Sequence, residues 1–348
     1  MSILSTSAVY SECDADCKFQ RCVRLLVVVS FVSSSLLLPL MIYMVVVKSQ
    51  QMRKYRWYLL NTIVWCYVFD FIIFLTHPIP VFPTTCVLFV PIVEMSQNLT
   101  VFAFYVGMFS LINLDLSILW TLLFRFTQVF PNKLNHYFEN SKSIYLLYLF
   151  VHLFVYVTMF LTIAFGQEWN WNQTRSNFLS QNPVLIAYVN QPMVCFKNED
   201  HFRFYHFCMS IMLIFFFFVG NALHGLLLHV LYKTRRNSVI QSTFRLQMML
   251  FRAFTWELFI AYILLLFPFA IQGLLVYYKF EHTDKITVLN LALMSLHGTI
   301  DNLTMLYFIS PWYKTITGWI RRRSNKRILI CPIAEVIDEL QDPIQPCF

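Results

Sequence analysis

Long runs of apolar residues alternate with short polar segments along the whole chain. A helix needs about 20 apolar residues to cross the hydrocarbon core of a bilayer. Seven runs reach this length: Val23–Val47, Trp57–His77, Gln97–Phe124, Ile144–Phe165, Phe207–Tyr232, Phe254–Tyr278 and Ile286–Ile309. The pattern therefore predicts an all-α membrane protein, built as a bundle of seven transmembrane helices.

One further apolar segment, Pro83–Met95, does not fit this series. It is too short to span a bilayer and is interrupted by Pro91. We expect it to form a loop or the start of a helix. An eighth crossing at this point would reverse the orientation of every later helix.

Basic residues are unevenly distributed between the connecting segments. If the N-terminus lies outside, 18 of the 26 Lys and Arg residues fall in cytoplasmic segments. Membrane proteins concentrate basic residues on the cytoplasmic side. We therefore expect an extracellular N-terminal segment (1–22), a membrane domain (23–309) and a cytoplasmic tail (310–348). Apolar residues at helical spacing predict a short basic amphipathic helix in that tail: Trp312, Ile316, Trp319 and Ile320.

The composition agrees with a membrane protein. Of the 348 residues, 58% are hydrophobic and only 13% are charged, whereas about a quarter of the residues in a soluble domain are charged. This excludes a soluble enzyme, a disordered chain and a fibrous protein. The net charge of +8 is best explained by basic loops that face the anionic lipid of the bilayer, and we expect no nucleic-acid partner.

Several ionisable residues lie inside the predicted spans. A charged group at mid-membrane costs about 2.5–3.5 kcal/mol, so such groups face the bundle interior or a water-filled cavity. One hypothesis is a proton or cation path, but no ordered series of acids supports it. We favour polar contacts in the bundle interior or in a ligand pocket, with these residues as candidates: Asp70, His77, Asp115, His297 and Asp301. Glu257 lies near the predicted cytoplasmic end of its span.

Four cysteines in the predicted outer segments are candidates for disulfide pairing, and the longest outer loop contains a glycosylation sequon. Cys86 and Cys195 both face the oxidising side, so we expect a disulfide between them. Cys13 and Cys17 could instead pair with each other or compete for these partners. Asn172 begins an N-x-T sequon in the longest outer loop, which makes it a candidate glycosylation site.

The sequence has no motif that supports catalysis. It contains no H-E-x-x-H, no C-x-x-C and no G-x-S-x-G. We therefore predict a protein that is not an enzyme and that needs no cofactor and no metal ion.

Two prolines lie inside predicted spans. Pro39 and Pro268 each remove a backbone hydrogen bond, so we expect a kink in the first and sixth helices.

Short motifs give the chain a family resemblance. Met52–Asn61 (MRKYRWYLLN) and His77–Pro83 (HPIPVFP) resemble the start and end of the second span in nematode serpentine chemoreceptors of the Str superfamily. Ser295–Gly298 (SLHG) and Pro311–Lys314 (PWYK) are similar to later motifs of these receptors. The resemblance covers about residues 20–325 and is closest to the class I and class H receptors.

The resemblance implies a G-protein-coupled receptor that detects an odorant or pheromone. It implies a small-molecule ligand bound under the 166–206 loop and a heterotrimeric G-protein α subunit as partner. It also implies a plasma membrane location, with the sensory cilium of chemosensory neurons as the candidate site. The expected G-protein contacts are basic: Arg125, Arg235, Arg236 and Arg245.

The motifs of rhodopsin-like receptors are not reproduced in this chain. No acid stands beside Arg125, and the seventh span has Asp301-Asn302 where those receptors have Asn-Pro. Two alternatives therefore stay open, namely a transporter or ligand-gated cation channel, and an orphan receptor that folds but does not signal.

Overall fold

The structure is a computed structural model. It describes residues 3–49, 55–81, 85–129, 142–170, 176, 191–237, 241–280, 283–309 and 312–318.

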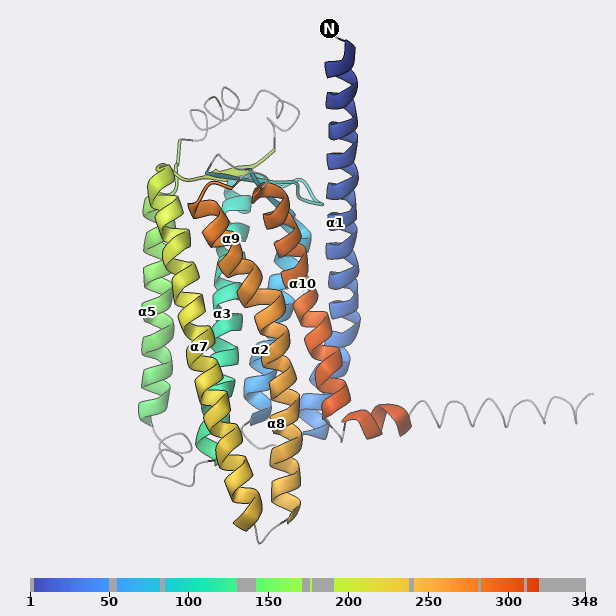
Figure 1. The fold of residues 1–348 in the computed structure, drawn as a ribbon, viewed down its shortest axis with the longest axis vertical. Coiled ribbons are helices and arrows are strands. Elements are labelled where there is room, and N and C mark those ends of the chain that lie inside the picture. The colour runs from blue at the N-terminus through green and yellow to red at the C-terminus, as the bar shows by residue number, and fades with distance from the viewer. Residues whose placement is uncertain are drawn as a thin grey trace, which may run out of the picture.

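Long helices run side by side and form one bundle (Figure 1). Five crossings are made by α1 (Ile3–Tyr43, continued by a π-helical turn, η1, at Met44–Lys48), α2 (Tyr55–Thr76), α3 (Gln97–Val129), α5 (Lys142–Gly166) and α7 (Glu199–Asn237). The sixth is composite, with α8 (Gln241–Ala261), the π-helical turn η4 (Tyr262–Leu266) and α9 (Phe267–Tyr277) in succession. The seventh is α10 (Thr283–Phe308).

The prediction of a helical membrane bundle is confirmed. Six of the described helical segments are long and apolar enough to cross a bilayer, the composite α8–η4–α9 segment among them. The seventh helix, α10, packs against α1, α2, α8 and α9. The helices extend beyond the predicted spans at several ends, most of all in α1, which begins at Ile3 instead of Val23.

Regular α-helical geometry is interrupted close to both predicted kink sites. Pro39 lies in the last turns of α1, just before η1, and Pro268 directly follows η4. The nitrogen of Pro268 cannot donate to the carbonyl of residue 264, which lies within η4, so a π-helical turn accommodates the missing bond. The side-chain amide of Asn290 on α10 donates to the carbonyl of Pro268 at 2.9 Å, which ties this joint to the seventh helix.

A small antiparallel sheet covers one end of the bundle, which we call the sheet end (Figure 1). Its strands, in order, are β1 (Pro78–Val81), β2 (Cys86–Phe89) and β3 (Met193–Cys195). Cys86 pairs in register with Cys195, and a disulfide joins the two residues. The prediction of a loop or helix start over Pro83–Met95 is therefore wrong for residues 86–89. The apolar C-V-L-F run forms the middle strand because β1 and β3 satisfy its backbone groups on both sides.

At the opposite end of the bundle, which we call the tail end, the chain continues after α10 and leads away to one side (Figure 1). Residues 312–318 form about two turns of helix. Trp312, which the sequence pattern assigned to the apolar residues of an amphipathic helix, is fully buried, and its indole nitrogen donates to Ser49 Oγ at 2.8 Å. Trp319 and Ile320 lie outside the described residues.

Candidate functional site

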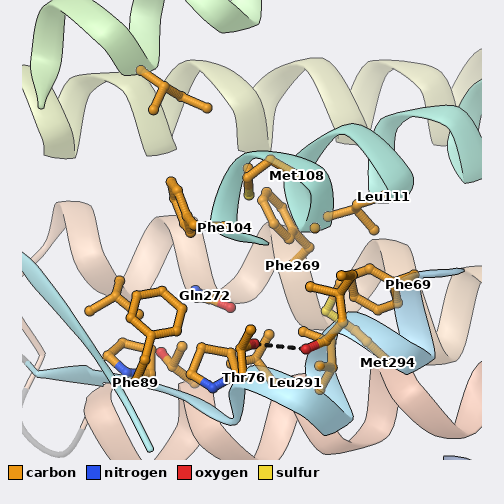
Figure 2. A pocket seen from close by; sticks show the side chains of 18 of the residues that line it. Phe69, Thr76, Phe89, Phe104, Met108, Leu111, Phe269, Gln272, Leu291 and Met294 are labelled. Atoms are coloured by element: carbon orange, nitrogen blue, oxygen red, sulfur yellow. Dashed lines mark hydrogen bonds between the residues drawn. The ribbon is translucent and has the colours of Figure 1, made fainter. Parts of the chain in front are cut away.

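A pocket lies beneath the sheet, between α2, α3, α9 and α10 (Figure 2). Its cavity volume is about 140 Å³. The floor and walls are mainly apolar and rich in aromatic rings, as expected for a site that binds small molecules. Six phenylalanines line it: Phe69, Phe89, Phe104, Phe196, Phe202 and Phe269.

Few polar groups reach this pocket, and most of them are already engaged. The hydroxyl of Thr76 donates to the carbonyl of Ile72 at 2.7 Å, and that of Thr287 donates to the carbonyl of Thr283 at 2.7 Å. Gln272 differs, because its Oε1 is buried and has no hydrogen-bond partner among the described residues. Figure 2 shows its amide between Phe104 and Thr76. A buried acceptor left unpaired costs about 1–3 kcal/mol, so Gln272 is prepared to accept a hydrogen bond from a ligand.

A polar cluster occupies the bundle interior where α1, α2 and α10 meet. Ser34 Oγ donates to Asp70 Oδ2 at 2.8 Å and lies 3.0 Å from Thr299 Oγ1. Cys66 Sγ lies 3.6 Å from His297 Nδ1. Gly298 allows this close approach, because a Cβ atom at that position would lie 2.6 Å from Cys66 Sγ and 2.9 Å from Asp70 Oδ2.

A second cluster is centred on Arg125 of α3, nearer the tail end. The guanidinium donates hydrogen bonds to the hydroxyl of Tyr55 on α2 and to the carbonyl of Leu250 on α8. Its Cζ lies 4.2 Å from the centroid of the Tyr55 ring and 4.9 Å from that of Phe254, which are cation–π distances. Glu257 of α8 is close enough for its charge to interact with that of Arg125.

This charged cluster extends to the seventh helix. Asp301 of α10 lies close enough to Glu257 for the two acids to repel each other when both are ionised. One carboxylate oxygen of each acid is buried and has no hydrogen-bond partner among the described residues. The Arg125 cluster, which we define as Arg125, Tyr55, Glu257, Asp301 and the Leu250 carbonyl, therefore connects α2, α3, α8 and α10.

The sequence comparison agrees with this architecture. The model of the serpentine type 7TM GPCR chemoreceptor family Srh matches residues 22–322. The chain belongs to the Srh family. Its members are receptors of the chemosensory type, not enzymes, and the resemblance to nematode receptors of the Str superfamily is confirmed. No match was found among curated proteins.

The predicted polar residues of this Srh receptor do not line the pocket beneath the sheet. Asp70, His297 and Asp301 lie together in the bundle interior, on the helices just described. Asp115 lies on α3 and faces a different cavity, between α3 and α7. Sequence reasoning missed Gln272, although a lone amide in an apolar span was a visible signal.

His77 forms the turn between α2 and β1 at the sheet end. It follows α2 with a φ of 40°, a left-handed conformation that is unusual for a residue with a side chain. This turn directs the chain from α2 into β1, and the carbonyl of His77 accepts a hydrogen bond from the Val90 amide at 3.3 Å. Burial, with a smaller contribution from the charge of Arg24, lowers the pKa of His77 to about 4, so its ring is neutral at pH 7.

The remaining predicted site residues lie near the ends of the bundle. Arg125, a predicted G-protein contact, is only 8% exposed in this conformation. Arg235 and Arg236 lie in the last turn of α7, and Arg245 in the first turns of α8, at the tail end (Figure 1). Asn172 and the side chains of these three arginines lie outside the described residues, as do the side chains of Cys13 and Cys17.

The polar cluster at Gly298 gives a stability prediction. Changing Gly298→Ala places a Cβ against Cys66 and Asp70 and forces the cluster apart. We expect a loss of about 1–3 kcal/mol, typical of overpacking, measured as a lower thermal unfolding midpoint of the purified receptor. Gly225→Ala on α7 is the matched control, because no atom lies within 4 Å of its added Cβ. Equal midpoints for the two variants would show that the cluster is not tightly packed.

Proposed function

We propose that this Srh receptor detects a small, mainly apolar molecule in the pocket beneath the sheet and activates a heterotrimeric G protein at the tail end. The observation that carries the proposal is the composite sixth helix. Its outer part, α9, contributes Phe269 and Gln272 to the pocket, and its inner part, α8, contributes Leu250 and Glu257 to the Arg125 cluster. One helix therefore joins a ligand-sized cavity to a buried cation.

The proposed orientation places the sheet end outside the cell. A disulfide persists in an oxidising compartment, and the Cys86–Cys195 bridge lies at this end. The arginines at positions 235, 236 and 245 then lie on the cytoplasmic side, in agreement with the distribution of basic residues. We propose the plasma membrane as the location, with a sensory cilium as the site of detection.

The pocket indicates the chemistry of the ligand. A cavity of about 150 Å³ is known to admit benzene, so about 140 Å³ suits a single ring or a short branched chain. The aromatic lining favours apolar contact, and the unpaired Oε1 of Gln272 favours one hydrogen-bond donor on the ligand. An alcohol of this size meets both requirements.

Activation would act through the joint at η4. A π-helical turn next to a proline is a point where a helix bends easily. Movement of α8 away from α3 breaks the bond from Arg125 to the Leu250 carbonyl and exposes the guanidinium. Arg125 would then contact the G protein, and Arg235, Arg236 and Arg245 would orient it. Family membership favours this mechanism over a transporter or a channel.

The ligand side of the proposal is tested at Gln272. Screening small alcohols in cells that express the receptor with a chimeric Gα subunit should identify an agonist. Gln272→Leu removes the acceptor, and we expect the half-maximal concentration of that alcohol to rise at least tenfold, because a lost hydrogen bond in a dry site costs about 1–3 kcal/mol. The adjacent Ile271→Ala, at a side chain that is 49% exposed on the outer surface of the bundle, should change it little. An unchanged dose response in Gln272→Leu would exclude this binding mode.

The signalling side is tested at Tyr55. Tyr55→Phe keeps the ring under Arg125 but removes the hydroxyl that accepts its hydrogen bond. We expect a severalfold rise in basal G-protein activation at equal surface expression, because the conformation with Arg125 buried loses a charge-assisted bond. Tyr58→Phe is the control, since the Tyr58 ring stacks on Phe124 at 4.7 Å without contacting Arg125. Equal basal activity in the two variants would contradict the proposed role of the Arg125 cluster and would favour a receptor that does not signal.

A further inference from the structure

A second cavity opens on the side of the bundle, between α3, α7 and the composite sixth helix. Its volume is about 110 Å³, and it shares no lining residue with the pocket beneath the sheet. We call it the lateral groove. Most of its lining is aliphatic, and two of its residues carry polar groups at the side-chain end: Asp115 on α3 and Tyr262 in η4.

Asp115 has no partner within the described protein. Its side chain is exposed to the lateral groove, and no described residue donates a hydrogen bond to its carboxylate or pairs with it. A carboxylate in the middle of a membrane span is costly unless a cation or donor compensates it. The fold itself supplies no compensation here, in contrast to Asp70, which accepts a hydrogen bond from Ser34.

Tyr262 provides a second, independent sign of an unfilled site. Its hydroxyl oxygen is buried and also has no hydrogen-bond partner among the described residues. The hydroxyl lies against Gly220 of α7, where an added Cβ would be only 2.7 Å away. The absence of a side chain at Gly220 therefore leaves room for the hydroxyl at the groove.

We propose that the lateral groove binds a protonated lipophilic amine. The ammonium group would donate to the carboxylate of Asp115 and to the hydroxyl oxygen of Tyr262, which satisfies both unpaired groups. The apolar part of the ligand would contact the leucines of α3, α7 and η4 that line the groove: Leu116, Leu119, Leu122, Leu213, Leu265 and Leu266.

Charge and size together define the ligand class. A neutral hydroxyl can donate one hydrogen bond but brings no charge to balance a carboxylate, so an amine fits Asp115 better than an alcohol or a sterol does. About 110 Å³ is somewhat less than a cavity that admits benzene. The groove therefore encloses the ammonium group and a short alkyl stem, and a ring on that stem would lie at its mouth on the side of the bundle.

The test compares two probes of the same shape. Full-length receptor in lipid nanodiscs is titrated with tritiated phenethylamine and with tritiated 2-phenylethanol, at a pH at which the amine is protonated. We expect saturable binding of phenethylamine that is at least tenfold weaker in Asp115→Asn, whereas binding of 2-phenylethanol, an alcohol that suits the pocket beneath the sheet, should not change in that variant. Equal amine affinity of Asp115→Asn and the unchanged receptor, an equal loss of both probes in Asp115→Asn, or no saturable amine binding would each overturn the proposal.

A second pair of variants keeps the test valid if Asp115→Asn does not fold. Gly220→Leu places a side chain against Tyr262 at the groove, and we expect at least a tenfold loss of amine affinity. Gly225→Leu is the control on the same helix, because no described atom lies within 4 Å of its added Cβ.

Gln272→Leu distinguishes the two cavities, because it alters only the pocket beneath the sheet and should leave amine binding unchanged. Loss of amine binding in Gln272→Leu would place the amine beneath the sheet and overturn the proposal, whereas a failure of alcohol detection in that pocket would leave the lateral groove unaffected.

Discussion

The guanidinium of Arg125 is buried among four helices, where water cannot satisfy its charge. The protein has to provide partners, and it does so with the Tyr55 hydroxyl, the Leu250 carbonyl, two aromatic faces and the nearby carboxylate of Glu257. Removing one partner of a buried charge costs far more than losing a surface contact. The positions of α2, α3 and α8 at the tail end therefore depend on one another through this cation.

The sheet end differs from the tail end in polarity. There the pocket is apolar and aromatic, and the Cys86–Cys195 disulfide fixes the strands that cover it. The two ends are joined by a sixth helix that is interrupted by η4 next to Pro268, with Asn290 bonded to the proline carbonyl. Such a helix transmits a displacement at one end to the other only if its joint has two stable positions. In the proposed mechanism the buried cation provides two such positions, because its charge is satisfied in one and exposed in the other.

The sequence was sufficient for the features that depend on composition and local pattern. Apolar runs predicted the helices, and the cost of buried charge predicted interior positions for Asp70, His297 and Asp301. It was not sufficient where long-range pairing decides the structure. Residues 86–89 become a strand because β1 pairs with them on one side and β3, whose Cys195 is 109 residues from Cys86, pairs on the other. The π-helical turns, the left-handed turn at His77 and the burial of Trp312 against Ser49 likewise arise from packing that no local pattern encodes.

The central claim is that the buried Arg125 holds α8 against α2 and α3. It is tested most directly by the distance between spin labels on non-natural residues introduced at Trp57 of α2 and Arg252 of α8, whose side chains are exposed. Pulsed electron paramagnetic resonance should give one narrow distance distribution in the unliganded receptor, and a second, longer distance should become populated in the Arg125→Gln variant. Superimposable distributions in the two proteins would contradict the account.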